Sequence, residues 1–241
     1  MFTGIVHSQR EVIGIDLDRE CGTIQIRLDG GLTERLEIGA SVAINGVCLT
    51  ASAIDGDLVS FDVIQSTIQK TNLLEVAGGD FVNVERSYVQ GDEIGGHEVS
   101  GHVDTTARVV AIEAVRGNVH QTFALPPFWM RYIFLQGFIA INGASLTVSE
   151  VDKKEHCFSV WLIPETLRRT NLNKVSIGDY VNIEVHKGVQ VVVDTVGDAV
   201  ERVITQAIEN ERLSGELVRD LLGTTGNLLQ GSSLNQSDYE E

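Results

Sequence analysis

The chain of 241 residues carries two copies of one sequence pattern. The segment at residues 44–50, Ile-Asn-Gly-Val-Cys-Leu-Thr, returns at residues 141–147 as Ile-Asn-Gly-Ala-Ser-Leu-Thr, a shift of 97 residues. Residues 64–73 and 79–85 return at residues 163–172 and 178–184, both at a shift of 99. A period of this length is that of a whole domain and not that of a solenoid repeat. The sequence therefore predicts two homologous domains in tandem, at residues 1–97 and 98–193, with two similar pockets in one chain.

Each copy has the pattern of an all-β domain built from short strands. Apolar and polar residues alternate, with many β-branched side chains, at residues 23–28, 41–44, 58–63, 81–85, 107–112, 137–141, 159–163 and 180–185. Turn signals made of Gly, Asn and Asp separate these segments. Short strands at this spacing are typical of a small closed barrel. Short helical turns are expected at residues 67–72, 127–133 and 166–171.

The chain changes character after the second copy. Apolar residues recur at three- and four-residue intervals over residues 194–208 and again over residues 213–222. This spacing predicts an amphipathic helical segment at residues 194–222, whose apolar stripe covers either the seam between the domains or further copies of the chain. Residues 223–241 are rich in Gly, Ser, Asn and acid, which predicts a flexible acidic tail.

The overall charge and the cysteines exclude several classes of protein. The formal net charge is −16, and no run of Lys or Arg exceeds two residues, so a nucleic acid would be repelled. The three cysteines, Cys21, Cys48 and Cys157, lie far apart, which fits neither a disulfide framework nor a zinc site. Because the chain has neither a signal-peptide pattern nor a long apolar stretch, we expect no membrane contact and a cytoplasmic location.

The repeated Asn-Gly turns are each followed by two candidate reactive side chains. Cys48 and Ser145 occupy equivalent places after the glycine, and Thr50 and Thr147 follow two residues later. Residues two apart in a strand face the same side, so each pair is expected to line one surface. The alternative is that a buried cysteine and a strand threonine serve only in packing.

A segment rich in glycine and histidine joins the two copies. Residues 95–104 read Gly-Gly-His-Glu-Val-Ser-Gly-His-Val-Asp, with histidines at His97 and His102. Imidazole is suited to moving protons near neutral pH, and glycines let the backbone approach a ligand closely. The alternative is a linker with incidental histidines. No H-E-x-x-H or G-x-S-x-G motif is present, which argues against a metal site and against a serine hydrolase.

Several motifs together resemble one known family. They are the start Met-Phe-Thr-Gly-Ile-Val at residues 1–6, the segment at 45–50, Gly-Gly-His at 95–97, Ser-Gly-His-Val at 100–103, and the segments at 143–148 and 181–184. In this order and spacing they resemble the riboflavin synthase family of the alpha-chain type, which is related to the lumazine proteins. The resemblance extends from Met1 to about Val203.

The resemblance implies a fold, an assembly and a reaction. The fold is two six-stranded Greek-key barrels followed by a C-terminal helix, assembled as a homotrimer with its sites between subunits. The reaction is the dismutation of two molecules of 6,7-dimethyl-8-ribityllumazine, in which one gives a four-carbon unit to the other. The products are riboflavin and 5-amino-6-(D-ribitylamino)uracil, and the reaction needs neither a cofactor nor a metal.

The resemblance also implies site residues. His102 and Thr147 would transfer protons at the methyl group of the substrate, Ser145 would polarise or protonate the ring, and Cys48 would serve the opposite half-site. The first pocket would use Gly4, Ile5, Val6, Ser41, Cys48, Leu49, Thr50, Asp62, Val63, Ile64, Gln65, Ser66, Thr67, Gly101, His102 and Val103. The second would use Ser145, Leu146, Thr147, Leu162, Ile163, Pro164, Glu165, Thr166 and Leu167. Phe2, His97 and Gln136 are also expected to bind substrate.

Four positions depart from the family pattern. The family usually has Lys where this chain has Gln136, and Asp where it has Asn142 and His186. It often has Glu where this chain has Ser66. The change at Gln136 removes a charge-assisted contact. Two alternatives to the enzyme therefore stay open: a paralogue that binds a lumazine or flavin without turning it over, and a scaffold that uses its barrels and acidic tail for docking.

Overall fold

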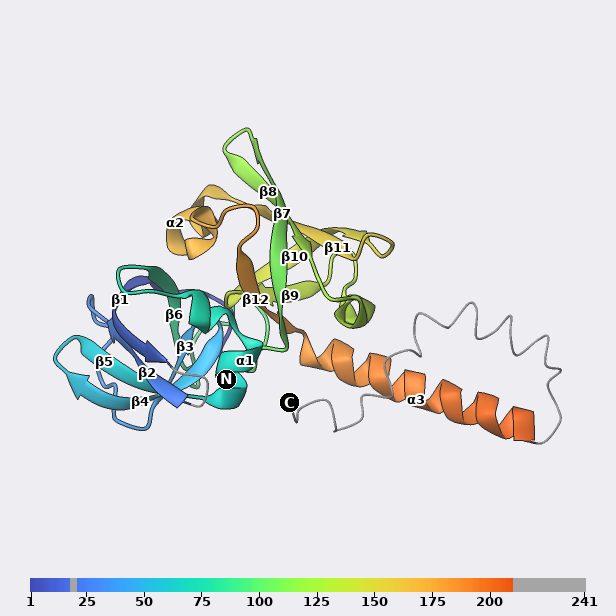
Figure 1. Cartoon of the computed structure of the whole chain (residues 1–241), viewed down its shortest axis with the longest axis horizontal. Helices are drawn as coiled ribbons and strands as arrows, with labels where there is room; N and C mark the ends of the chain where they lie inside the picture. The colour runs from blue at the N-terminus through green and yellow to red at the C-terminus, as the bar shows by residue number, and fades with distance from the viewer. Residues whose placement is uncertain (18–20, 210–241) are drawn as a thin grey trace. The chain divides into compact units, whose positions relative to one another are not determined.

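The computed structural model describes residues 1–17 and 21–209 and confirms the two predicted barrels (Figure 1). In the first, the strands are β1 (Ser8–Leu17), β2 (Cys21–Arg27), β3 (Ser41–Ile44), β4 (Val47–Asp55), β5 (Leu58–Ile64) and β6 (Phe81–Arg86). They close in the order β1-β2-β5-β4-β3-β6, and each strand is antiparallel to both of its neighbours. The three consecutive strands β3, β4 and β5 thus insert between β2 and β6.

The second barrel repeats this topology. Its strands are β7 (Thr105–Val115), β8 (Asn118–Ala124), β9 (Phe138–Ile141), β10 (Ala144–Asp152), β11 (Cys157–Leu162) and β12 (Tyr180–Val185). They close in the order β10-β11-β8-β7-β12-β9, which is the order of the first barrel with each strand replaced by its copy. The duplication seen in the sequence is therefore a duplication of the whole barrel.

The helical turns fall close to their predicted positions. They are α1 (Gln65–Lys70), η1 (Asn72–Glu75), η2 (Pro127–Tyr132), α2 (Pro164–Arg169) and η3 (Asn171–Asn173). The C-terminal helix α3 (Lys187–Glu209) begins at Lys187, earlier than the expected start at Asp194. The predicted helical run at 213–222 and the tail at 223–241 lie outside the described residues.

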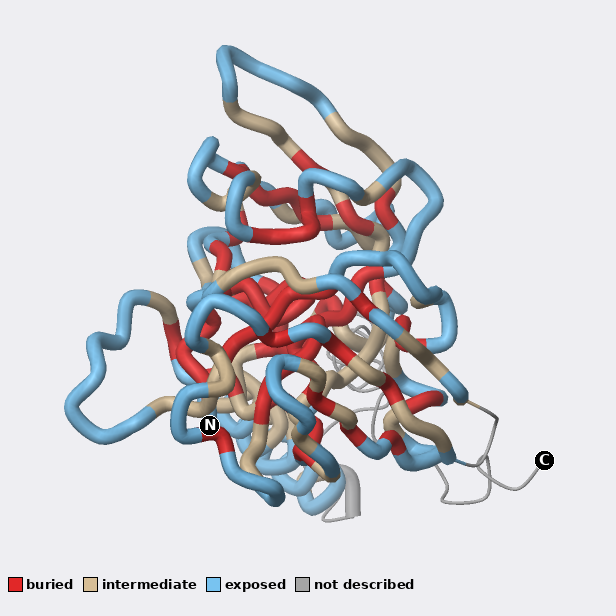
Figure 2. Tube along the Cα trace, turned by 90° about the vertical axis from the view of Figure 1, so that its left-hand side faces the viewer, coloured by how far each residue is buried: buried red, intermediate tan, exposed pale blue. Residues whose placement is uncertain are grey.

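Each barrel is filled by alternate side chains of its own strands. Figure 2 colours the buried residues red along the Cα trace. Ile24, Ile26 and Phe61 are completely buried in the first barrel. In the second barrel the buried rings of Phe123 and Phe158 stack with their centroids 5.4 Å apart. Because the inward residues are apolar, the outward residues of the same strands are free to form a site.

The two barrels meet through segments that are copies of one another. Phe2 and Val99, which are equivalent at the shift of 97, exchange backbone hydrogen bonds of 2.7 and 3.0 Å as an isolated antiparallel bridge. Both side chains are buried with Ala43 and Ala140, one residue from each barrel. The side chain of Phe2, which is expected to bind substrate, thus packs between the barrels.

Two glutamates hold the segments beside this bridge. The Glu85 carboxylate accepts hydrogen bonds from the backbone N–H groups of Thr3 and Gly4, at 2.6 and 3.1 Å. Its copy Glu184 accepts the equivalent bonds from Ser100 and Gly101, at 2.7 and 2.9 Å. The N-terminal segment and the segment between the barrels therefore adopt matching conformations about an approximate twofold axis.

A network of buried amides completes the contact between barrels. Its members are Asn45, Asn72, Asn83, Asn142, Asn171 and Asn182. Asn83 Nδ2 donates to the carbonyl of Asn142 at 2.8 Å, and its copy Asn182 donates to the carbonyl of Asn45 at 2.9 Å. Asn142, which departs from the family pattern, is a member of this network. Removing one such amide leaves buried partners unpaired, at a cost of about 1–3 kcal/mol for each group.

At the twofold axis the backbones of Gly46 and Gly143 touch. Both have positive φ, and a Cβ on Gly46 would lie 2.6 Å from the backbone nitrogen of Gly143. Gly46→Ala should therefore lower the free energy of unfolding by about 3 kcal/mol or more. Gly79→Ala is a matched control, because Gly79 has the same sign of φ with nothing within 4 Å. It should cost about 1 kcal/mol.

Urea unfolding of the wild type and of the two variants measures these differences in stability. If Gly46→Ala and Gly79→Ala unfold at the same midpoint, close contact between the barrels at this glycine is contradicted.

The helix α3 and the turn η2 form a second compact unit of the chain. The phenol of Tyr132 donates to Asp194 at 2.7 Å, and the guanidinium of Arg131 lies 3.2 Å from the same carboxylate. One series of valines on α3 is exposed: Val191, Val192, Val196, Val200 and Val203. Within residues 1–17 and 21–209, no helix combines the length and hydropathy needed to cross a membrane.

Candidate functional site

The first group of predicted residues lies on the outer surface of the first barrel. Ser41 pairs with Thr50, and Thr50 pairs with Asp62, so these three residues form one row across β3, β4 and β5. Directly paired residues on neighbouring strands face the same side of a sheet. Cys48, two residues before Thr50, is half-buried on that side, and its backbone N–H donates to the carbonyl of Gly101 at 2.8 Å. We call this group the Cys48 half-site.

The second group lies at the equivalent place on the second barrel. Thr147 pairs with Phe138, and Ser145 precedes it by two residues on the same side of β10. The backbone N–H of Ser145 donates to the carbonyl of Gly4 at 2.8 Å. The expected assignment of Gly4 to the first pocket is therefore wrong, because the N-terminal segment runs against the second barrel. We call this group the Ser145 half-site.

Close packing explains why a glycine stands opposite each reactive side chain. A Cβ on Gly4 would lie 2.6 Å from Cβ of Ser145, and a Cβ on Gly101 would lie 2.6 Å from Cβ of Cys48. The two glycines are equivalent at the shift of 97. The linking segment thus covers Cys48, as the N-terminal segment covers Ser145.

His97 is the partner of Ser145. Its Nδ1 lies 2.6 Å from Ser145 Oγ, and its side chain is buried. The ring stacks on Phe138 at 5.3 Å between centroids and faces His186 at 5.6 Å. Its backbone N–H donates to the carbonyl of Thr3 at 3.1 Å. The sequence placed His97 among the binding residues, and the structure joins it directly to the hydroxyl.

Burial gives His97 an unusual acidity. Desolvation, with a smaller repulsion from His186, lowers the pKa of His97 to about 4. The ring is therefore neutral near pH 7, and a neutral imidazole can either donate to a hydroxyl or accept from it. Within this dyad, Ser145 can give up a proton and regain it.

His102 is exposed and follows Gly101, beside the Cys48 half-site. Its backbone N–H donates to Ser100 Oγ at 3.1 Å. Thr147 is also exposed but belongs to the Ser145 half-site. The expected pairing of His102 with Thr147 at one methyl group therefore joins residues from different half-sites of one chain.

The other predicted residues divide by burial. The exposed or half-exposed ones are Ile5, Asp62, Ile64, Gln65, Ser66, Thr67, Val103, Gln136, Ile163, Pro164, Glu165, Thr166 and Leu167. The side chains of Val6, Leu49, Val63, Leu146 and Leu162 belong to the buried core. These five can offer a substrate only their backbone. Gln136 is exposed at positive φ, and its N–H donates to the carbonyl of Val148 at 2.8 Å.

Glu165 is held at the start of α2 by two arginines. Arg168 Nε and Arg169 Nε donate to its carboxylate, each at 2.8 Å. These hydrogen bonds lower the pKa of Glu165 to about 2. The carboxylate is therefore charged throughout the neutral range, and its charge is paired with those of the two arginines.

The aromatic residues of the second half-site escaped the sequence prediction. Phe138 is equivalent to Ser41, and Trp161 to Asp62, at the two repeat shifts. Both side chains are exposed, and the Trp161 ring lies 4.5 Å from that of His120. Aligning the two copies position by position identifies them, because they occupy the places of Ser41 and Asp62. The Ser145 half-site is thus aromatic where the Cys48 half-site is polar.

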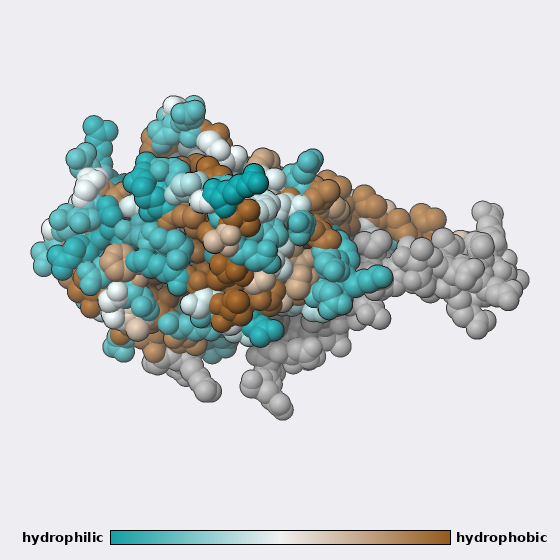
Figure 3. Space-filling model, turned by 90° about the horizontal axis from the view of Figure 1, so that it is seen from above, coloured by the Kyte–Doolittle hydropathy of each residue, from teal (hydrophilic) through white to brown (hydrophobic). Residues whose placement is uncertain are grey.

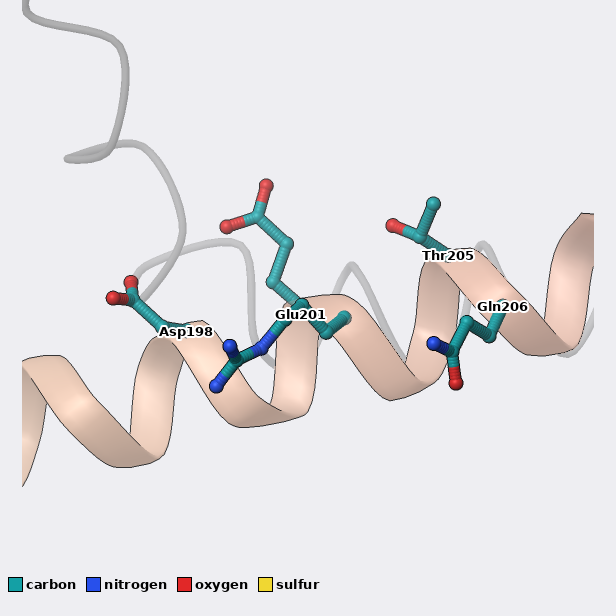
Figure 4. A pocket seen from close by; sticks show the side chains of 5 residues that line it. Asp198, Glu201, Thr205 and Gln206 are labelled. Carbon is teal, nitrogen blue, oxygen red and sulfur yellow. The ribbon is translucent and has the colours of Figure 1, made fainter.

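Two other hollows lie outside the half-sites. A groove of about 270 Å³ between the barrels is lined partly by the asparagine network, whose polar groups largely bind one another. A hollow beside α3 is lined by Asp198, Glu201, Arg202, Thr205 and Gln206, which all belong to one helix (Figure 4). In Figure 4 the side chains of Glu201 and Gln206 point in different directions. In the described part of the chain, no cluster of three metal-binding side chains occurs.

Comparison with known proteins agrees with this geometry. The model of the lumazine binding domain matches residues 3–87 and again residues 100–186. Riboflavin synthase of Escherichia coli K12 is 47% identical over 197 residues, covering 81% of this chain and 92% of that protein. Riboflavin synthase of Buchnera aphidicola subsp. Schizaphis graminum is 40% identical over 206 residues, covering 85% and 98%.

Solved structures with this fold include complexes with heterocyclic ligands. The crystal structure of LumP complexed with riboflavin has a TM-score of 0.72 at 26% identity, covering 77% of this chain and 100% of that chain. LumP complexed with 6,7-dimethyl-8-(1'-D-ribityl) lumazine has a TM-score of 0.70, with 77% and 99% covered. The fold and its paired sites define a protein with tandem lumazine binding domains. Within that class, the chain belongs to the riboflavin synthase family.

The pKa of His97 makes stability depend on pH. An unfolded histidine has a pKa of about 6.5. Between that value and the folded value of about 4, the unfolded chain binds a proton that the folded chain does not. Stability should therefore fall as the pH is lowered from 6.5 toward 4, and His97→Gln should remove this part of the dependence.

Urea midpoints of the wild type and His97→Gln at several pH values test this, with the exposed His102→Gln as control. Parallel curves for the wild type and His97→Gln would contradict a neutral, buried His97.

Proposed function

We propose that the chain catalyses the dismutation of two molecules of 6,7-dimethyl-8-ribityllumazine to riboflavin and 5-amino-6-(D-ribitylamino)uracil. The observation that carries the proposal is the pair of equivalent half-sites, each with a small reactive side chain beneath a glycine segment. A reaction that consumes two copies of one substrate needs two matched binding surfaces. The riboflavin synthases at 47% and 40% identity support the same conclusion.

The residues divide the work between positioning and proton transfer. Removing a proton from the 7-methyl group gives a carbanion that delocalises into the ring, so modest acid–base help is enough. The Ser145 hydroxyl, relayed by His97, polarises the ring bound on the second barrel. His102 and Thr147 move protons at the methyl group, and Cys48 serves the other ring.

The two half-sites form one working site only between subunits. We propose a homotrimer in which the first barrel of one subunit faces the second barrel of its neighbour, with α3 packing on its copies. The exposed valines of α3 support this assembly, because such a series on one helix is costly to leave in water. Hydrophobic groups also interrupt the mainly hydrophilic face of the molecule seen in Figure 3. His102 and Thr147 then come from different chains.

A protein that binds lumazine without turnover is the rival function, favoured by the structural likeness to LumP. Incubation with 6,7-dimethyl-8-ribityllumazine alone separates the possibilities. Riboflavin fluorescence that grows with many turnovers supports the synthase. A stoichiometric shift of the bound spectrum without product indicates a carrier, and an unchanged spectrum indicates a scaffold. The last two results contradict the proposal.

Mixing two inactive variants tests whether sites lie between subunits. Cys48→Ala damages one half-site and Ser145→Ala the other, so each variant alone should lose at least about tenfold in kcat. Refolding them together should restore about a quarter of the sites, because random assortment places two intact halves together at that frequency.

The matched control mixes Ser145→Ala with Ser145→Ala Cys48→Ala, which offers no intact second half-site. Activity of the first mixture at the level of this control would contradict sites shared between chains.

Charge on the apolar face of α3 should break the assembly. Val196→Lys places an ammonium where the valine is 55% exposed and, in the trimer, is expected to be covered. Light scattering should report a monomer at micromolar concentration, with turnover lost. Thr195→Lys, an exposed polar position on the same helix, is the control and should remain a trimer. A trimer for both variants would exclude this face as the interface.

A further inference from the structure

The groove between the barrels is lined by residues that the duplication relates in pairs. Its volume is about 270 Å³, and its lining includes Glu75, Phe81, Lys174 and Tyr180. At the shift of 99 residues, Phe81 is equivalent to Tyr180, and Glu75 is equivalent to Lys174. The groove therefore has two equivalent aromatic rings, but one copy has an acid where the other has a base.

In one half of the groove the chain provides its own cation. The ammonium of Lys174 lies 3.5 Å from the centroid of the Phe81 ring, which is a close cation–π contact. The side chains of Phe81 and Tyr180 are equally exposed, at 43%. Among the described residues, no lysine or arginine lies over the ring of Tyr180. The second half thus keeps the aromatic surface without the cation.

Two carboxylates lie close together in this second half. Partial burial, and to a smaller extent the charge of Asp179, raise the pKa of Glu75. Neither carboxylate is in an ion pair within the described ranges 1–17 and 21–209. Two neighbouring negative charges repel each other, and a cation between them would relieve that repulsion.

A buried amide of the same groove has an oxygen without a hydrogen-bond partner. Asn72 lines the groove and is only 8% exposed, and its Oδ1 accepts no hydrogen bond from the part of the chain that the structure describes. Its Nδ2 donates to the carbonyl of Tyr180 at 3.0 Å, which places the amide beside β12. In the other copy, Asn171 Oδ1 accepts from Asn142 Nδ2 at 3.2 Å. An unpaired buried acceptor is costly, so a donor bound here would be stabilised.

We propose that this half of the groove binds a primary alkylammonium ion. Its charge would lie over the Tyr180 ring and beside Glu75, as the ammonium of Lys174 lies over Phe81. Its three N–H groups would supply the donor that Asn72 Oδ1 needs. A magnesium or calcium ion fits less well, because it needs about six oxygen ligands and the described residues hold no cluster of three metal-binding side chains. The site is separate from both half-sites, so its test needs no turnover.

Nuclear magnetic resonance of the full chain with n-butylammonium chloride is the first measurement. Saturation of the aromatic protons of the protein should pass to the methylene protons of the probe. Because both carboxylates are exposed, we expect a Kd of about 1–10 mM.

Tyr180→Leu should weaken binding of the probe at least about fivefold. The matched control is Phe81→Leu, because the Phe81 ring already carries the ammonium of Lys174, and it should stay within about twofold of the wild type. Equal affinity for the wild type and Tyr180→Leu overturns the proposal, and so does an equal loss in both variants.

Thermal unfolding with a charge reversal is the second measurement. Glu75→Lys gives this half the arrangement of the other, so its own ammonium should occupy the Tyr180 ring and abolish binding of the probe. Saturating n-butylammonium should raise the unfolding midpoint of the wild type and leave that of Glu75→Lys unchanged. Glu37→Lys makes the same charge change at an exposed position of the first barrel and should keep the response.

Sodium chloride and magnesium chloride at the same ionic strength separate a specific site from screening of the acidic surface. Neither salt should raise the wild-type midpoint as far as n-butylammonium does. An equal rise with either salt, or a response of Glu75→Lys equal to that of the wild type, overturns the proposal.

Discussion

The structure depends on the contact between two copies of one barrel. Its components come in equivalent pairs: the Phe2–Val99 bridge, the Gly46–Gly143 approach, the glutamates Glu85 and Glu184, and the six buried asparagines. An amide is suited to this place because it both donates and accepts, so a symmetric contact can satisfy both copies. The same contact places the N-terminal segment against Ser145 and the linking segment against Cys48. The pairing of the barrels therefore also builds the two half-sites.

Duplication followed by divergence explains why two similar surfaces can treat two identical substrates differently. The row that reads Ser41, Thr50, Asp62 on the first barrel has Phe138, Thr147 and Trp161 at the equivalent places on the second. An aromatic surface favours stacking of a planar ring, whereas a polar row favours hydrogen bonds to its edge. The two reactive side chains also differ in their surroundings, because the hydroxyl of Ser145 has the buried imidazole of His97 as its partner and Cys48 lies beside Gly101. One ring can then act as donor and the other as acceptor.

The sequence alone predicts what is local or repeated. Alternation and turn residues locate most strands, and the shift of 97 residues identifies Cys48 and Ser145 as equivalents. Long-range contacts are beyond such patterns: the crossing of Gly4 to the second barrel and the meeting of His97 with Ser145 depend on how the barrels pair. The structural role of Asn142 is likewise beyond the sequence, because its buried amide bonds with residues far along the chain. The start of α3 was placed too late because Gly188 and consecutive valines obscure the helical period.

The central claim is that each chain offers two equivalent surfaces, each of which binds one lumazine ring. Calorimetric titration of the assembled protein with a lumazine that lacks the 7-methyl group tests this most directly, because such an analogue can bind but cannot react. The account predicts two molecules bound per chain, and one per chain after Ser145 is replaced by a bulky Trp. A stoichiometry of one per chain in the unaltered protein would contradict it.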